Sequence, residues 1–276
     1  MSSAAAPTPI PRLPHTGRVT QWRVFRSEWT KLRSVRSTRW SLLAAVAFTI
    51  GIAALACAVV SHHWAHLSPQ DRRDFHPLEP NLAGVQLAQL ALGVLGVLVI
   101  TAEYSTGMIR ASMTAVPRRL PVLWGKAAIA LGAVFAACVP AVLVAFFAGQ
   151  SILAKVGLDI SFGQPGVARA VLGSAFYLAV AAVLGLGLGA LLRNTAAAVT
   201  ALFGLLFGLQ LLAGMIPGSA GVTLEKFMPS TAGQAIASVH PDPGTSLGPW
   251  AGLGLFAGYT VIVLALAARR MSRGDA

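Results

Sequence analysis

Residues 170–192 read AVLGSAFYLAVAAVLGLGLGALL, a run of 23 residues without one charged side chain. The apolar core of a bilayer is roughly 30 Å thick and needs about 20 helical residues to cross it. Because lipid offers the backbone no hydrogen bonds, only helices and closed barrels span a membrane. Barrel strands would alternate polar and apolar residues over about ten positions, whereas this run is apolar on every face. The run therefore predicts a transmembrane helix.

Five more charge-free runs are long enough to span a bilayer: Leu42–Val60, Asn81–Ala102, Ala127–Ala154, Asn194–Leu224 and Pro243–Ala268. With their polar ends trimmed, we place the six spans at about 41–61, 82–102, 127–149, 170–192, 196–216 and 249–268. The composition agrees, since 55% of the residues are hydrophobic and 11% are charged, whereas soluble domains are about a quarter charged. We predict an all-α membrane protein whose six-helix transmembrane domain occupies 40–276.

The charged residues predict the orientation of the bundle. The 276 residues carry a net charge of +12. If the N-terminus is cytoplasmic, the inner segments hold 16 basic and 3 acidic residues, and the outer segments hold 5 basic and 6 acidic residues. The positive-inside rule then places both termini in the cytoplasm and the chain in the cell membrane. These charges form short clusters between apolar runs, so the sequence predicts no nucleic-acid partner.

The segment before the first span is predicted to have two parts. Residues 1–18 are rich in Ala, Pro, Ser and Thr and read as a disordered tail. The first 38 residues contain no apolar core, which argues against a cleavable signal peptide. Residues 19–39 place Trp22, Phe25, Trp29 and Leu32 on one helical stripe, with basic residues on the other faces. This pattern favours an amphipathic helix lying on membrane lipids. The alternatives are a solvated charged helix or a simple basic anchor.

Three glutamines are the main polar side chains inside the spans: Gln86, Gln89 and Gln210. Intramembrane amides usually face the interior of a bundle. They either bind helices together or line a pathway for a polar part of a substrate, and the sequence leaves both interpretations open. No Asp, Glu or Lys lies in the middle of a span, so an ion-coupled transporter is disfavoured.

Other candidate sites have simpler interpretations. Cys57 and Cys138 fall inside spans and are expected to be small buried hydrophobic residues rather than a disulfide. His62 and His66 have the spacing of a metal-binding pair, but no third ligand has a fixed spacing to them, and we expect no metal site. Ser174 would need a base at membrane depth to act as a protease nucleophile. The chain has no P-loop and therefore no ATP site of that kind.

Glycine pairs four residues apart occur in the last three spans: Gly185 and Gly189, Gly204 and Gly208, and Gly254 and Gly258. Such spacing permits close packing of helices or dimerisation. It arises often in glycine-rich spans, so it is weak support for any particular interface.

The predicted cytoplasmic loop between the second and third spans carries a distinct motif. It begins Glu103-Tyr104-Ser105-Thr106-Gly107-Met108-Ile109-Arg110 and continues through Pro117-Arg118-Arg119 to Lys126. The loop is polar at its start and Pro117 ends it, which fits a brief helix parallel to the membrane. Glu103 would lie near the N-terminal end of that helix, where the helix dipole favours an anion.

With this loop the sequence resembles the permease subunits of ABC-2-type transporters, especially those of high-GC Gram-positive bacteria. Two other stretches are also similar to that family: Ser27–Ser34 before the first span, and Pro229–Ile236 before the sixth. Met108 is a departure, because the family often has Thr at this position. The resemblance extends over nearly the whole chain from about residue 20.

The resemblance implies roles for several segments. Residues 19–39 would be the elbow helix, and Glu103–Val116 would be the coupling helix that docks on a separate P-loop ATPase. The residues implied in this coupling are Glu103, Tyr104, Gly107, Arg110, Pro117 and Arg118. Residues 222–228 and 231–238 would form a re-entrant hairpin broken at Pro229-Ser230.

The resemblance also implies the partners and the mechanism. ATP and Mg would bind the partner ATPase, so this chain would hold no cofactor. It would pair with a second permease copy or a paralogue and export an amphipathic or lipid-linked molecule. Two other classes stay open: a polytopic membrane enzyme, and a membrane anchor or signalling partner without transport.

Overall fold

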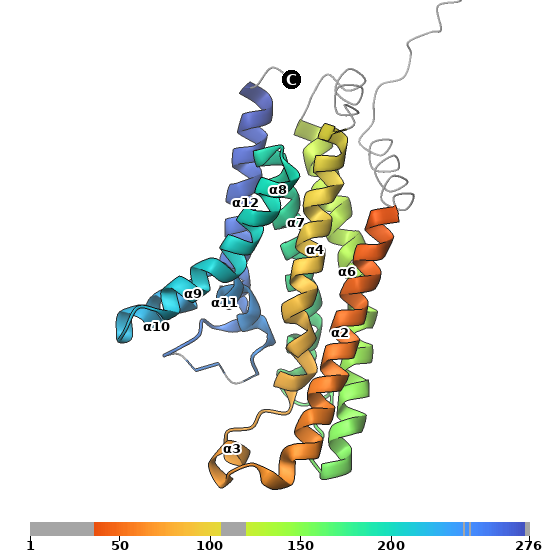
Figure 1. The fold of residues 1–276 in the computed structure, drawn as a ribbon, viewed down its shortest axis with the longest axis vertical. Coiled ribbons are helices and arrows are strands. Elements are labelled where there is room, and N and C mark those ends of the chain that lie inside the picture. The colour runs from red at the N-terminus through yellow and green to blue at the C-terminus, as the bar shows by residue number, and fades with distance from the viewer. Residues whose placement is uncertain (1–35, 106–119, 240, 243, 274–276) are drawn as a thin grey trace, which may run out of the picture.

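The computed structural model describes residues 36–105, 120–239, 241–242 and 244–273. Within these residues every regular element is a helix, and six helical segments are long and apolar enough to cross a membrane. The predicted all-α architecture, with six segments able by length and composition to span a membrane, is therefore confirmed for the described residues (Figure 1). The tail at 1–18 lies outside the described residues, as do Trp22, Phe25, Trp29 and Leu32 of the predicted interfacial helix.

Five of the spans are single helices: α2 (Arg36–His63), α4 (Leu78–Ser105), α6 (Leu120–Leu153), α7 (Val167–Leu192) and α12 (Pro249–Arg273). Each extends beyond its predicted span at one end or both, because polar residues continue a helix past its apolar part. Residues 36–39, which we had assigned to the interfacial helix, belong to α2. Side chains such as Leu43, Leu55 and Val261 are more than half exposed, as expected for surfaces that face lipid.

The central helix of the bundle is α7, which packs against α4, α6 and α12, while α2 packs against α4 and α6. A seam of glycines brings α4 and α7 into backbone contact. A Cβ added to Gly96 would lie 1.8 Å from the carbonyl oxygen of Ala182, and one added to Gly185 would lie 2.0 Å from that of Gly93. Only glycine permits such an approach.

The seam tests the predicted glycine pairs. A Cβ on Gly189 would lie 2.5 Å from the side chain of Ile100, so the pair in the fourth span does serve close packing. A Cβ on Gly204, Gly208, Gly254 or Gly258 would meet nothing within 4 Å in the described part of the chain. Those two pairs therefore do not pack helices within this chain as it is described.

The fifth span is broken rather than straight. It comprises α8 (Thr195–Phe203), a π-helical turn η3 (Gly204–Gly208) and α9 (Leu209–Gly214), and α10 (Ser219–Lys226) follows it. Figure 1 shows these elements running obliquely away from the other spans. We call residues 195–226 the arm. Asn194 begins it by accepting a hydrogen bond from the backbone N–H of Ala197 at 2.9 Å, the usual role of an N-cap.

After the arm, α11 (Pro229–Gln234) and η4 (Ala235–Ala237) return to pack against α12 and α7. The two short helices predicted before the last span are present, but the break lies at Phe227-Met228 rather than at Pro229-Ser230. Pro229 is the first residue of α11 because proline lacks the N–H that this position leaves unused. Tyr259 of α12 donates a hydrogen bond to the carbonyl oxygen of Phe227 at 2.9 Å and holds this break in place.

Short helices occupy the two connections at the opposite end of the bundle from the α4–α6 loop. They are η1 (Trp64–His66), α3 (Pro69–Arg73) and η2 (Ala154–Val156). Ser68 caps α3 by accepting from the backbone N–H of Asp71 at 3.1 Å.

Candidate functional site

A buried ion pair closes the base of the α4–α6 loop. The Nζ atom of Lys126 lies 2.9 Å from Oε1 of Glu103, and their side chains are 2% and 7% exposed. Glu103 lies in the last turn of α4 and Lys126 in the second turn of α6. The two ends of the loop motif therefore contact each other directly. Gly107, Arg110, Pro117 and Arg118 lie outside the described residues.

The structure places Glu103 in the last turn of α4, where the helix dipole favours cations. The brief loop helix that we expect after it, with Glu103 near its N-terminal end, lies outside the described residues. Lys126 supplies the compensating charge, because an ion pair at hydrogen-bond distance is much stronger than an interaction with a helix end.

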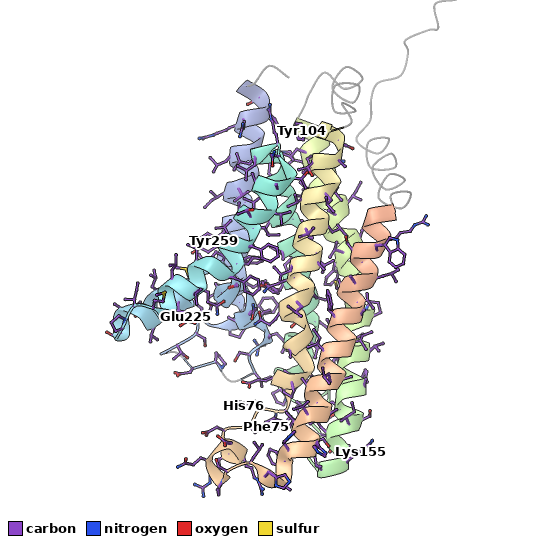
Figure 2. All side chains as sticks on the ribbon, viewed as in Figure 1. Phe75, His76, Tyr104, Lys155, Glu225 and Tyr259 are labelled. Carbon is purple, nitrogen blue, oxygen red and sulfur yellow. The ribbon has the colours of Figure 1, made fainter. Side chains whose placement is uncertain are left out.

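Tyr104, the next residue along α4, joins the ion pair to two further helices. The guanidinium carbon of Arg193 lies 5.6 Å from the centre of the Tyr104 ring, within the range of a cation–π contact. Nη2 of Arg193 donates to the carbonyl oxygen of Arg270 at 3.4 Å, and Nη1 of Arg270 donates to the carbonyl oxygen of Leu191. Figure 2 labels Tyr104 at this end of the bundle. The ends of α4, α7 and α12 are thus connected.

Arg193 also has an unusual backbone. Its φ is +56°, and it is the non-glycine residue with positive φ in the described part of the chain. This left-handed conformation costs roughly 1–2 kcal/mol for a residue with a Cβ, and such strain persists where surrounding contacts hold the residue. We call Glu103, Tyr104, Lys126, Arg193 and Arg270 the loop-base cluster.

A second group of polar residues lies within the bundle. Tyr177 donates to Oε1 of Gln89, and Nε2 of Gln89 donates to Oε1 of Gln86 at 3.3 Å. The amides of Gln86 and Gln234 donate to each other, with 3.1 Å for the bond from Gln234, and Nε2 of Gln234 lies 3.5 Å from the hydroxyl of Tyr177. Gln89 and Tyr177 are completely buried. We call these four residues the amide network.

The amide network contains two of the three intramembrane glutamines, for which helix packing and pathway lining were both left open. Gln86 and Gln89 share a face of α4, as expected, but Gln210 is not part of the network. Its Oε1 accepts a hydrogen bond from Ser230 at 3.0 Å, which connects the arm to α11. The hydrogen bonds of these glutamines to Tyr177 and Gln234 were not predicted. The sequence feature that could have pointed to Gln234 is its position in the stretch 229–236, which resembles the permease family.

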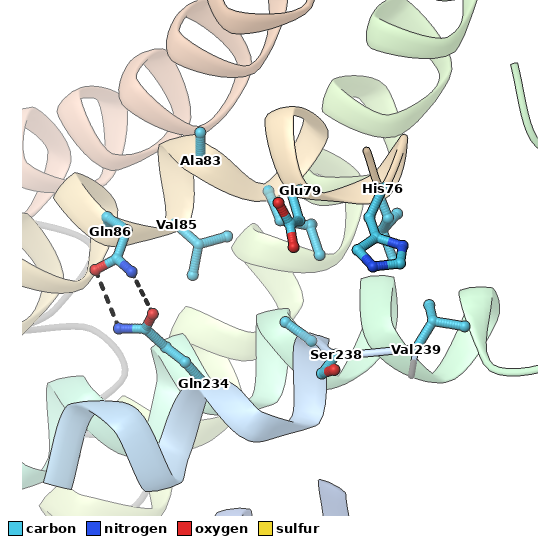
Figure 3. A pocket seen from close by; sticks show the side chains of 11 residues that line it. His76, Glu79, Ala83, Val85, Gln86, Gln234, Ser238 and Val239 are labelled. Atoms are coloured by element: carbon cyan, nitrogen blue, oxygen red, sulfur yellow. Dashed lines mark hydrogen bonds between the residues drawn. The ribbon is translucent and has the colours of Figure 1, made fainter. Parts of the chain in front are cut away.

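A pocket of about 360 Å³ opens beside the amide network (Figure 3). It lies between the first turns of α4 and the segment formed by α11, η4 and the residues that follow. Its polar lining side chains are His76, Glu79, Gln86, Gln234 and Ser238. Figure 3 shows the paired amides at one end of this lining and His76 and Glu79 toward the other.

The remaining candidates have structural surroundings. Cys57 and Cys138 are buried and unpaired. The hydroxyl of Ser174 donates to the carbonyl oxygen of Ala170 at 2.7 Å, one turn earlier in the same helix. His62 stacks edge-on against His63 at the end of α2. In the described part of the chain, no three His, Cys, Asp or Glu residues are grouped as a metal site would require.

No protein-family model matches this chain, and no curated protein matches it. The resemblance to ABC-2-type permeases therefore stays a prediction from three stretches of sequence.

Proposed function

We propose that this chain is the membrane-spanning subunit of an ATP-driven exporter of the ABC-2 type, which works with a separate ATPase. The observation that carries this proposal is the buried pair of Glu103 and Lys126 at the base of the loop that would meet the ATPase. It agrees with the sequence motif, which begins and ends at these two residues.

A loop that transmits force must be firmly attached to the helices that it moves. Glu103 and Lys126 attach this loop to α4 and α6, and a buried ion pair is costly to break. Tyr104 and Arg193 extend the attachment to α7, and Arg270 extends it to α12. A displacement of residues 106–119 by a partner would therefore act on four spans together.

The energy in this proposal comes from the partner. The chain has no P-loop, and the middle of its spans lacks Asp, Glu and Lys, so ATP and Mg would bind the ATPase. Two permease copies, or this chain and a paralogue, would alternate between inward-facing and outward-facing states. ATP shifts that equilibrium only if it binds one state more tightly than the other. Both termini would lie in the cytoplasm, with residues 19–39 as the elbow helix on the membrane surface.

Co-purification tests the proposal. The full-length chain, tagged and extracted in mild detergent from its own host, should retain a P-loop ATPase, and vesicles containing both should export an amphipathic compound when given ATP and Mg. Deletion of residues 104–112 should abolish export. The control is Glu225→Gln, which removes a carboxylate from α10, far from the loop-base cluster in Figure 2. The proposal fails if no ATPase is retained and export survives the deletion.

A further inference from the structure

The pocket beside the amide network has the size and lining of a small ligand site. Its volume of about 360 Å³ lies in the range of roughly 300–1,000 Å³ that ligand pockets occupy. Leu82, Val85 and Val239 supply apolar wall, and the polar side chains lie on the same walls. Arg169 fixes one wall by donating to the carbonyl oxygen of Ser238 at 3.0 Å.

The paired amides of Gln86 and Gln234 could each form one more hydrogen bond, with a ligand. Both N–H groups of Gln234 are used, by Gln86 and Tyr177, and both lone pairs of Gln86 Oε1 are used, by Gln89 and Gln234. Among the hydrogen bonds of the described residues, one N–H of Gln86 and one lone pair of Gln234 Oε1 are left without a partner. A donor and an acceptor therefore lie side by side at the pocket.

This pair of groups selects the chemistry of the ligand. A hydroxyl group both donates and accepts, so it can satisfy the Gln86 N–H and the Gln234 oxygen together. An ammonium group cannot accept and a carboxylate cannot donate, so each of them could form only one of the two hydrogen bonds that a hydroxyl group can form here. Glu79 adds an acceptor for a second hydroxyl, and no Lys or Arg occurs among the described lining residues to attract an anion.

We propose that this pocket binds the uncharged, hydroxyl-rich head group of an amphiphile, such as a sugar-bearing lipid, with its apolar part against Leu82, Val85 and Val239. As a site of transport this inference rests on the proposed function, but binding itself does not. The ligand hydroxyl would contact the amides of Gln86 and Gln234, which are hydrogen-bonded to Gln89 and Tyr177. Binding of the ligand would therefore affect hydrogen bonds of side chains buried within the bundle.

Photolabelling of the full-length chain in lipid nanodiscs tests the site. The probe is octyl β-glucoside with a diazirine in its alkyl chain, and two matched probes carry the same chain with a primary ammonium or a carboxylate head. We expect the glucoside probe to label residues 76–86 and 234–239, as mapped by mass spectrometry, and excess octyl glucoside to compete with it. The two charged probes should label these residues about tenfold less, the effect of one unsatisfied hydrogen bond.

Variants make the test specific. Gln86→Leu should reduce labelling about tenfold, and Glu79→Gln, at an exposed position outside the amide network, should reduce it roughly threefold. Gln164→Leu, at an exposed position in the α6–α7 connection, should leave it unchanged. Equal labelling of lipid-facing residues on α2 by the glucoside probe overturns the inference, and so does labelling of the pocket by either charged probe as strongly as by the glucoside probe. No ATPase is present in this experiment, so a failure of the transport proposal would not alter its result.

Discussion

Replacing Glu103 by Gln should destabilise the protein strongly, because it leaves Lys126 without its carboxylate. At 2.9 Å and an effective dielectric constant of about 20, the attraction between the two charges is about 6 kcal/mol. Desolvation of both charges in the folded state offsets part of it. Removing one partner of a buried pair typically costs about 3–5 kcal/mol. We expect Glu103→Gln to lower the free energy of unfolding by that amount.

The double variant Glu103→Leu, Lys126→Met separates stability from coupling. It removes both charges and keeps similar volumes, and such replacements are often neutral or stabilising by about 1–4 kcal/mol. If the pair transmits force from the loop, the double variant should be as stable as the native chain and still fail to couple ATP hydrolysis to export. A purely structural pair would let the double variant regain both stability and export.

The measurement is reversible unfolding of the purified full-length chain in mixed micelles, followed by helix content. Lys155→Met, at an exposed position in η2, and Glu225→Gln serve as matched controls, and each should change the stability by less than about 0.5 kcal/mol. The reasoning is refuted if Glu103→Gln is as stable as its controls, or if the double variant is no more stable than the single one.

Two further substitutions test the packing and the amide network. Gly96→Ala should lower the free energy of unfolding by about 1–3 kcal/mol or more, because its Cβ would lie 1.8 Å from a backbone oxygen of α7. Gly132→Ala, whose Cβ would have nothing within 4 Å, should leave the free energy of unfolding unchanged or raise it slightly in the same measurement. Tyr177→Phe should lower the free energy of unfolding by about 1–3 kcal/mol, because the buried Oε1 of Gln89 loses its hydrogen-bond donor. Tyr259→Phe removes an exposed hydrogen bond and should lower the free energy of unfolding much less. Equal decreases for the two variants would contradict the importance of burial.

The spans were predictable because insertion into lipid depends on local hydropathy, which a run of sequence carries by itself. The interruption of the fifth span was not, since a π-helical turn depends on the surroundings of the helix as well as on its sequence. The α4–α7 seam was missed for a related reason. Spacing of four residues marks Gly185 and Gly189 on α7, but on α4 the close contacts involve Gly93, which meets Gly185, and Gly96, which meets Ala182, and these two glycines are three residues apart.

The polar partners were harder to predict, because they are distant in sequence. Glu103 and Lys126 were both noted as parts of one motif, but only the antiparallel arrangement of α4 and α6 brings them together. Gln86 and Gln234 are 148 residues apart and meet because α11 folds back onto the bundle. Hydropathy places each residue at a depth in the membrane, whereas the pairing of helices is set by packing across the whole fold.

The amide network and the loop-base cluster are connected by the closely packed contact between α4 and α7. Gln89 and Glu103 lie on α4, fourteen residues or roughly 21 Å apart along a helix. Between them Gly93 and Gly96 hold α4 against the backbone of α7. Because the two backbones are in contact, we expect α4 and α7 to move as one body. We expect movement to be easier in the arm, where Gly204 and Gly208 meet nothing within the described chain and the helix contains a π-helical turn. A motion that begins at the loop base would therefore open the bundle between the α4–α7 unit and the arm, beside the hydrogen bond from Ser230 to Gln210.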